Sequence, residues 1–328
     1  MRAYISGTGS YLPARVMTNE EVCRRAPTTD AWIREKLGIE TRRIAAPDEQ
    51  ASDMGTAAAR QALAAAGLGS NDLDAILCAL GTGDVVSPAT AGYIQHKLGV
   101  TNQCMAMDIR AACAGGISGI QLGRSLITAG MARHVLVVGT QLGSRTAVDW
   151  SDRLTAGIFG DGAGAAVVSA TQDATRGILA GRVHTDGSLT GIVGQYAGGS
   201  VEPLTAEVLK TGRQFIRMDG KAVWACAERV LPQVVGEVLQ EAGLSLSDVD
   251  FVVAHQANRR MLLHILGLMG MDATRTHTNV EHYGNTVAAS ALIALDESVR
   301  QGHVRPGKRV VMMAIGAGMT WGALAMRW

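Results

Sequence analysis

The chain has 328 residues, a formal net charge of +1, 47% hydrophobic residues and 18% charged residues. This length allows two domains of ordinary size, or one large layered fold with a substantial core. The balanced charge, without long basic or acidic runs, excludes the electrostatic pattern typical of proteins that bind nucleic acids or anionic membranes.

Cysteine usage and apolar runs indicate the compartment. The five cysteines are scattered and never spaced as C-x-x-C, so the sequence predicts neither a disulfide framework nor a zinc site. The N-terminus lacks the apolar core of a signal peptide, and no run of about 18 apolar residues occurs elsewhere. We therefore expect a soluble cytoplasmic protein with no metal site.

The first half of the chain alternates strands and helices. Residues 66–80, AGLGSNDLDAILCAL, predict a helix that ends at glycine, a short acidic turn and a buried strand. Residues 113–130 predict another helix that ends in glycine, and residues 134–139, HVLVVG, predict a second strand. The glycine-rich stretch at 158–168, IFGDGAGAAVV, comes next. Such alternation is typical of α/β folds.

The second half repeats this order. Residues 242–256, AGLSLSDVDFVVAHQ, match the pattern of 66–80, and residues 285–302 match 113–130 in length and in their final glycine. A strand follows at 309–315, RVVMMAI, and leads into a second glycine-rich stretch, IGAGMTWGA. The repeats predict a duplicated α/β fold whose halves cover residues 1–171 and 172–328.

Three polar residues are predicted to converge where the halves meet. By the offset between the repeats, Cys113 corresponds to Asn285, each at the start of a helix. His255 ends the strand VVAH, and open α/β sheets bind ligands at the carboxyl ends of their strands. Taken singly, a cysteine is most often an inert buried thiol, a histidine can be a core residue, and an asparagine before a helix is a common N-cap.

Cys113 is the candidate nucleophile of this group. A cysteine at a helix N-terminus has a lowered pKa, because unpaired backbone N–H groups favour the thiolate. Its small neighbours in AACAGG let a substrate carbonyl approach the sulfur and leave backbone N–H groups free for an oxyanion. The other four cysteines are interpreted as structural.

Motifs along almost the whole chain resemble those of the thiolase-fold condensing enzymes, specifically the β-ketoacyl-acyl-carrier-protein synthase III family. In chain order they are GTGSYLP, TTDAWI, GIETRR, AACAGG, IFGDGAGA, HQANRR, HYGNTVAAS and GAGMTWGALAMRW. The resemblance implies a five-layered αβαβα fold, a homodimer, and a catalytic triad of Cys113, His255 and Asn285.

The resemblance also implies a reaction. Cys113 would take an acyl group from acyl-CoA, and a malonyl thioester would then bind and lose carbon dioxide. The resulting enolate would attack the acyl-enzyme, while His255 and Asn285 donate hydrogen bonds to the malonyl thioester carbonyl. Backbone N–H groups of Cys113 and Ala317 would form the oxyanion hole. Both thioesters are substrates, and the resemblance implies no cofactor.

Further residues are assigned to substrate and partner by the same resemblance. The implied coenzyme A residues are Trp32, Lys36, Arg153 and Gly220. Lys36 stands where arginine is frequent, and it lacks the planar face of a guanidinium. Basic residues for docking an acyl carrier protein are reduced to Arg259 and Arg260 near the tunnel mouth. Ser87 stands where the family often has a bulky residue that limits the acyl pocket, so we expect a primer that is longer, branched or aromatic rather than acetyl.

Several alternatives remain open at this point. The triad could serve a specialised pathway, with acyl transfer to oxygen or nitrogen and no decarboxylation. A papain-like protease also needs Cys, His and Asn in this order, with the histidine about 130–150 residues after the cysteine, although it would not explain the duplication. An inactive thiolase-fold partner subunit would usually lack the nucleophile. A hydroxymethylglutaryl-type synthase would need an acidic base, for which Asp84 is the only nearby candidate by motif order, and Asp84 looks more like a turn residue.

Overall fold

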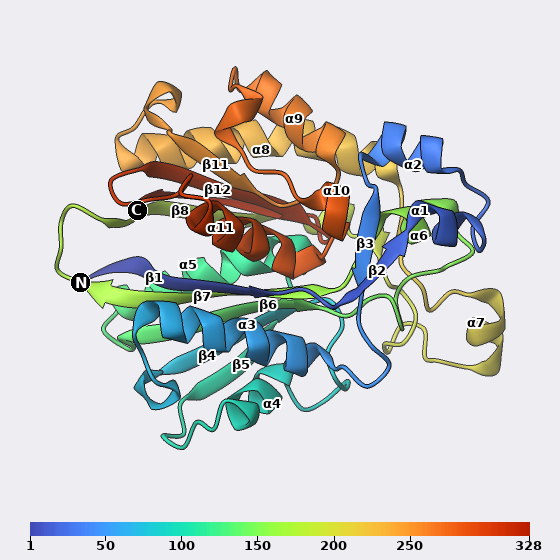
Figure 1. The fold of residues 1–328 in the computed structure, drawn as a ribbon, viewed down its shortest axis with the longest axis horizontal. Helices are drawn as coiled ribbons and strands as arrows, with labels where there is room; N and C mark the ends of the chain where they lie inside the picture. Colours follow the sequence, from blue (N-terminus) through green and yellow to red (C-terminus); the bar gives the residue numbers. More distant parts are fainter.

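Five alternating layers of helix and sheet make up the molecule, a computed structural model that describes residues 1–328 (Figure 1). The first sheet has the strand order β1 (Arg2–Tyr11), β7 (Gly162–Thr171), β6 (His134–Gln141), β4 (Ala75–Leu80) and β5 (Met105–Ile109). The second sheet has the order β11 (Phe251–Ala254), β12 (Arg309–Gly316), β13 (Thr320–Arg327) and β8 (Gly177–Thr185).

Helices occupy the layers between and outside the sheets (Figure 1). The central layer contains α5 (Gly115–Thr128) and α11 (Ser290–Arg300). The first sheet is covered on its outer face by α3 (Ala51–Ala66) and α4 (Thr90–Lys97), and the second by α8 (Gly220–Ala242) and α9 (Arg259–Leu268). None of the helices has both the length and the apolar character of a membrane span. The αβαβα order confirms the fold that the motifs imply.

Short strands and helices lie at one end of the layers (Figure 1). The short strands are β2 (Arg15–Thr18), β3 (Thr41–Ile44), β9 (Val193–Gly194) and β10 (Arg217–Met218). The short helices are α1 (Asn19–Cys23), α2 (Asp30–Leu37), α6 (Arg153–Ile158), α7 (Ala206–Thr211) and α10 (Val280–Tyr283). In Figure 1, α7 projects from the body of the molecule.

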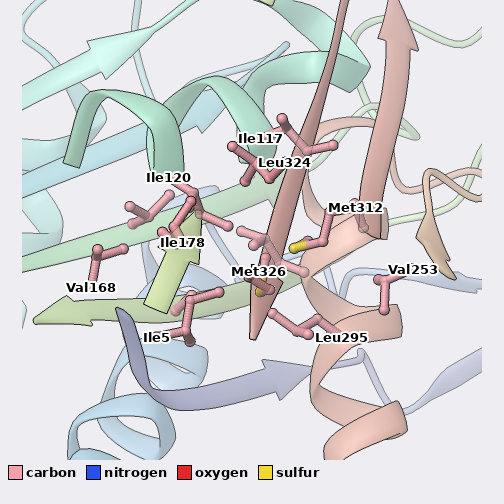
Figure 2. Packing of buried hydrophobic residues seen from close by; sticks show 14 of the residues in the cluster. Ile5, Ile117, Ile120, Val168, Ile178, Val253, Leu295, Met312, Leu324 and Met326 are labelled. Carbon is pink, nitrogen blue, oxygen red and sulfur yellow. The ribbon is translucent and has the colours of Figure 1, made fainter. Parts of the chain in front are cut away.

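The central helices form a core that joins the two sheets. Figure 2 shows Ile117 and Ile120 of α5 packed among side chains of both sheets, including Val168 of β7 and Met312 of β12. All these side chains are buried. Because helices cover both faces of each sheet, strands such as β4 are apolar throughout rather than alternating. This packing holds the halves in one fixed arrangement.

The duplication is visible in the positions of equivalent elements. β1 and β8 begin 175 residues apart, as do β6 and β12, and as do α5 and α11. The short 3₁₀ turns η2 (Ala112–Ala114) and η6 (Val287–Ala289), which precede the central helices, keep the same offset. Cys113 is therefore equivalent to Ala288, and the expected correspondence between Cys113 and Asn285 is wrong by three residues. Asn285 instead lies just before the turn.

Candidate active site

One cavity of about 1140 Å³ brings the three candidate residues together. Its lining includes Cys113 from the first half, and His255, Asn285 and Ala317 from the second. Cys113 follows β5, whereas His255 follows β11 directly. The cavity thus lies at the carboxyl ends of strands from both sheets, as expected for open α/β sheets.

The backbone around Cys113 is held by close contacts that only small residues permit. A Cβ atom on Gly115 would lie 2.8 Å from the Cβ of Ala79, so glycine lets the turn and α5 sit directly on β4. A Cβ on Gly316 would lie 2.5 Å from the backbone nitrogen of Cys113. The loop that carries Ala317 therefore passes next to the Cys113 amide.

The protonation state of Cys113 differs from the sequence expectation. Burial raises the pKa of Cys113 to about 12, although its backbone N–H and the Asn285 side chain both favour the thiolate. Desolvation has the larger effect, because burial disfavours the charged thiolate.

The His255 ring is held in one orientation, and burial disfavours its charged form. Its backbone N–H donates to the Met313 carbonyl at 2.9 Å, and burial lowers the pKa of the ring to about 3. The ring Nδ1 contacts the Ser290 hydroxyl, which also accepts the backbone N–H of Gln256 at 3.3 Å. With that hydroxyl donating its proton to Nδ1, the ring hydrogen resides on Nε2. Nε2 is then a hydrogen-bond donor for the cavity.

Asn285 is clamped between the two halves of the molecule. Its backbone N–H donates to the Ile158 carbonyl at 2.8 Å, and its carbonyl accepts the Gly160 N–H at 3.1 Å. Its side-chain Oδ1 accepts the Val287 N–H at 2.8 Å. Since Oδ1 is engaged, the Nδ2 amide is the end of the side chain that is free to donate toward Cys113.

Two glycines allow these backbone segments of the two halves to approach each other. They explain why glycine occurs at these positions of two motifs. A Cβ on Gly160, in IFGDGAGA, would lie 2.1 Å from the Tyr283 carbonyl oxygen. Gly284, in HYGNTVAAS, has φ of +68°, and a Cβ there would lie 2.8 Å from the Ile158 carbonyl oxygen. The segments on either side can approach closely only because both residues lack side chains.

Residues assigned to coenzyme A gather at the mouth of the same cavity. Trp32, Lys36 and Gly220 line it. Arg153 does not line it, but its guanidinium lies 4.0 Å from the centre of the Trp32 ring, a cation–π contact that orients the indole. The Lys36 ammonium lies 2.6 Å from the Glu35 carboxylate, so it is already paired with an anion.

Three other predicted residues lie elsewhere. Ser87 is exposed and does not line the cavity of its own chain, so the expectation that its small side chain leaves room for a larger primer stays a prediction. Asp84 accepts hydrogen bonds from the backbone N–H and the hydroxyl of Ser52, so it stabilises a turn rather than serving as a base. Of the two docking arginines, Arg260 lines the cavity, whereas Arg259 lies outside it and pairs with Glu281 at 2.7 Å.

Sequence reasoning missed several polar residues of the site, and two of them, Ser290 and Gln141, bear on its chemistry. Ser290, which contacts His255, lies five residues after Asn285 within HYGNTVAAS, but only the structure shows which side chain it meets. Gln141 ends β6 and lines the cavity with Cys113. Its place at the carboxyl end of a buried strand was a usable signal, since that is where His255 was found.

A duplicated αβαβα fold with a cysteine, a histidine and an asparagine in one shared cavity defines an acyl-transferring condensing enzyme. Family models named 3-oxoacyl-[acyl-carrier-protein] synthase III and its C-terminal part match residues 107–187 and 239–328. The β-ketoacyl-[acyl-carrier-protein] synthase III of Rhizorhabdus wittichii is 42% identical over 327 residues, which cover 100% of this chain and 99% of the relative. The chain belongs to the β-ketoacyl-acyl-carrier-protein synthase III family.

Solved structures agree with this assignment. The 3-oxoacyl-[acyl-carrier-protein] synthase III of Aquifex aeolicus is 38% identical, with a TM-score of 0.91 over 99% of this chain and 100% of that chain. The priming β-ketosynthase of a polyketide biosynthetic pathway is 34% identical, with a TM-score of 0.90 over 99% of this chain and 96% of that chain. The protein is therefore a condensing transferase, and the protease and inactive-partner alternatives are not favoured.

Proposed function

We propose that Cys113 carries the acyl group between two thioester substrates and that His255 and Asn285 stabilise the enolate that attacks it. One observation carries this assignment: a single cavity joins a thiol from one half to an imidazole and a carboxamide from the other. Neutral donors suit an enolate that is formed by loss of carbon dioxide, because they stabilise the developing charge without attracting the departing carboxylate.

The loading step forms one thioester and breaks another. The Cys113 sulfur attacks the carbonyl carbon of acyl-CoA, and backbone N–H groups of Cys113 and Ala317 hold the oxyanion. The carbon–sulfur bond to coenzyme A breaks, and the thiol proton leaves with the coenzyme A thiol. This direct exchange fits a cysteine whose pKa is about 12, since no free thiolate need persist in the resting site.

The condensing step then uses the donors of the second half. The malonyl thioester carbonyl accepts hydrogen bonds from Nε2 of His255 and Nδ2 of Asn285, and loss of carbon dioxide leaves an enolate. Its carbon attacks the acyl carbonyl, the bond to the Cys113 sulfur breaks, and one proton from solvent restores the thiol. The scheme needs no cofactor beyond the two thioester substrates.

The substrates and the assembly are also proposals. We infer that Trp32 stacks on the adenine of acyl-CoA and that a carrier protein docks near Arg260, which supports the use of both thioester types. A cytoplasmic homodimer is supported by the free edge of β5, where Met105 and Met107 are 37% and 52% exposed, and by five free cysteines. The size of the cavity supports a primer larger than acetyl.

Intact-mass measurement tests the scheme. The enzyme is incubated with a panel of acyl-CoA thioesters, beside a Cys113→Ala variant, and is then given malonyl-CoA or a malonyl carrier protein. We expect a mass gain of one acyl group on the natural enzyme only, followed by its loss with release of labelled carbon dioxide. Acylation of the Cys113→Ala variant would refute the nucleophile. Transfer without carbon dioxide release would favour an oxygen or nitrogen acceptor.

A further inference from the structure

An unpartnered amide is buried in the wall of the cavity. Gln141 is only 1% exposed, and its side-chain Oε1 has no hydrogen-bond partner within the chain. The same residue lines the cavity that contains Cys113. A buried amide oxygen without a partner is costly, so native structures rarely keep one without a reason. A bound substrate group could supply the hydrogen-bond donor that the chain does not provide for Oε1.

The topology places this amide beside the nucleophile. β4 pairs in parallel with β5 on one side and with β6 on the other. Gln141 is the last residue of β6, and Cys113 lies four residues past the end of β5. Both residues therefore lie at the carboxyl ends of their strands, and β4 lies between these two strands. Neighbouring strands lie about 4.8 Å apart, which puts the two strand ends roughly 10 Å from each other. The side chains of Gln141 and Cys113 cover part of this distance, and a short acyl chain on the sulfur covers the rest.

The chain leaves dedicated space for the amide. A Cβ on Gly143 would lie 2.4 Å from the Gln141 Nε2, and a Cβ on Gly81 would lie 2.9 Å from its Oε1. Gly81 directly follows β4, the strand between Gln141 and Cys113. The amide therefore fits in a slot between two glycines, and this slot opens on the cavity that Gly81 also lines.

The surroundings of the slot are otherwise mainly apolar. Leu80, Ala147, Leu154 and Phe159 line the same cavity. The nearby Thr82 hydroxyl already accepts the Leu142 N–H at 3.3 Å. A hydrocarbon acyl chain would suit the apolar lining but would leave the Gln141 amide without a partner.

We propose that Gln141 selects an acyl primer that carries a hydroxyl group on its chain. This inference rests on the proposed function, since it concerns the acyl group that Cys113 accepts. A hydroxyl can donate to Oε1 and accept from Nε2, so it satisfies either end of the amide. A site built to bond a substrate hydroxyl discriminates against the analogue that lacks it, because the buried amide is then left unpaired.

Matched pairs of primers test the proposal. Rates of Cys113 acylation are measured by intact mass with 3-hydroxybutyryl-CoA of either configuration and with 4-hydroxybutyryl-CoA, each against butyryl-CoA. The natural enzyme should prefer at least one hydroxyacyl primer by about tenfold in kcat/KM, the size expected when a buried polar group gains its partner. A Gln141→Leu variant should lose or reverse this preference.

A second glutamine provides the control. Gln121 on α5 also has a buried Oε1 without a partner, but it does not line the cavity. A Gln121→Leu variant should keep the preference of the natural enzyme. Gln141→Leu should also retain its melting temperature, because no hydrogen bond of Oε1 to the chain is lost.

The outcomes separate this inference from the proposed function. Acylation of Cys113 by every primer at equal rates, or an unchanged preference in Gln141→Leu, overturns the role of Gln141 while leaving the nucleophile intact. A clear fall in the melting temperature of Gln141→Leu alone shows a structural amide and also overturns it. Failure of all primers to acylate Cys113 refutes the loading step itself, and the inference with it.

Discussion

The two halves of the molecule use one scaffold for different chemical tasks. The turns before α5 and α11 are equivalent, yet the first holds Cys113 at the cavity, whereas the second holds the fully buried Ala288 at the matching position. The second half contributes Asn285 just before its turn and Ser290 just after it. The two halves thus have similar backbones around these turns. They differ in which positions around each turn carry a polar or reactive side chain.

Desolvation shifts the pKa of Cys113 in the first half and the pKa of His255 in the second half in opposite directions. Burial raises the pKa of the Cys113 thiol to about 12 and lowers the pKa of the His255 imidazole to about 3. Both groups are therefore neutral over the whole range between these values. Burial is the main cause of both shifts, because it disfavours whichever form of a group is charged.

The largest expected effect separates the tasks of the two halves. His255→Ala should lower the condensation rate by about 10²- to 10³-fold, the cost of losing one donor to a developing oxyanion. Acylation of Cys113 should continue, since loading uses the backbone N–H groups of Cys113 and Ala317 and not the His255 ring. Intact-mass kinetics measures the first step and labelled carbon dioxide the second.

The matched control for this variant is His264→Ala, which removes a histidine on α9 that pairs with Glu228 outside the cavity. It should leave both steps unchanged. An equal loss of loading and condensation in His255→Ala would show that the two halves do not divide the reaction.

The next prediction concerns the close backbone contact between the two halves at Gly160. Gly160→Ala should lower the free energy of unfolding by about 2–4 kcal/mol, because the new Cβ would overlap the Tyr283 carbonyl oxygen. Urea denaturation measures this change. Gly267→Ala in α9, where a Cβ meets no atom within 4 Å, is the control and should not destabilise the protein. A neutral Gly160→Ala would mean that the segments can separate freely.

A third prediction uses the lowered pKa of His255. The unfolded histidine titrates near its ordinary pKa of about 6.5, so between pH 6.5 and 3 the unfolded chain binds the proton that the native site refuses. The native state therefore loses stability as pH falls through this window, by up to about 1.4 kcal/mol per pH unit from this one group.

His255→Gln should remove that contribution. The free energy of unfolding of the variant, measured by urea denaturation from pH 7 to 4, should fall less steeply than that of the natural protein. Parallel curves would show that His255 is protonated at its ordinary pKa in the folded state. Above pH 7 the slopes should coincide, since His255 is neutral in both states there.

The smallest effect compares equivalent helices on the outer faces. A Cβ on Gly236 in α8 would meet no atom within 4 Å, whereas a Cβ on Gly55 in α3 would lie 2.9 Å from Ile94 Cδ1 and 3.1 Å from Val138 Cγ1. Gly236→Ala should raise the free energy of unfolding by about 0.5–1 kcal/mol through helix propensity. Gly55→Ala should lower it by about 1 kcal/mol. Thermal unfolding of both variants tests this difference, and equal shifts would contradict it.

Much of the fold and of the catalytic centre could be predicted from particular stretches. The matching runs at 66–80 and 242–256 indicated the duplication, since buried strands and glycine-ended helices leave strong local patterns. Cys113, His255 and Asn285 were recognisable from their motifs and their places at element ends. The predicted equivalence of Cys113 and Asn285 in the two repeats was wrong, because an offset that is estimated from similar sequence patterns has an error of a few residues.

By itself, the sequence determined the order of strands and helices, the duplication and the identity of the polar residues, because periodicity and turn chemistry are local properties of the chain. Only the tertiary structure decided the raised pKa of Cys113, the contact of Ser290 with His255, the position of Ser87 outside the cavity of its own chain and the unpaired amide oxygen of Gln141. Each of these depends on which distant segments pack together and exclude water, and local patterns do not encode that.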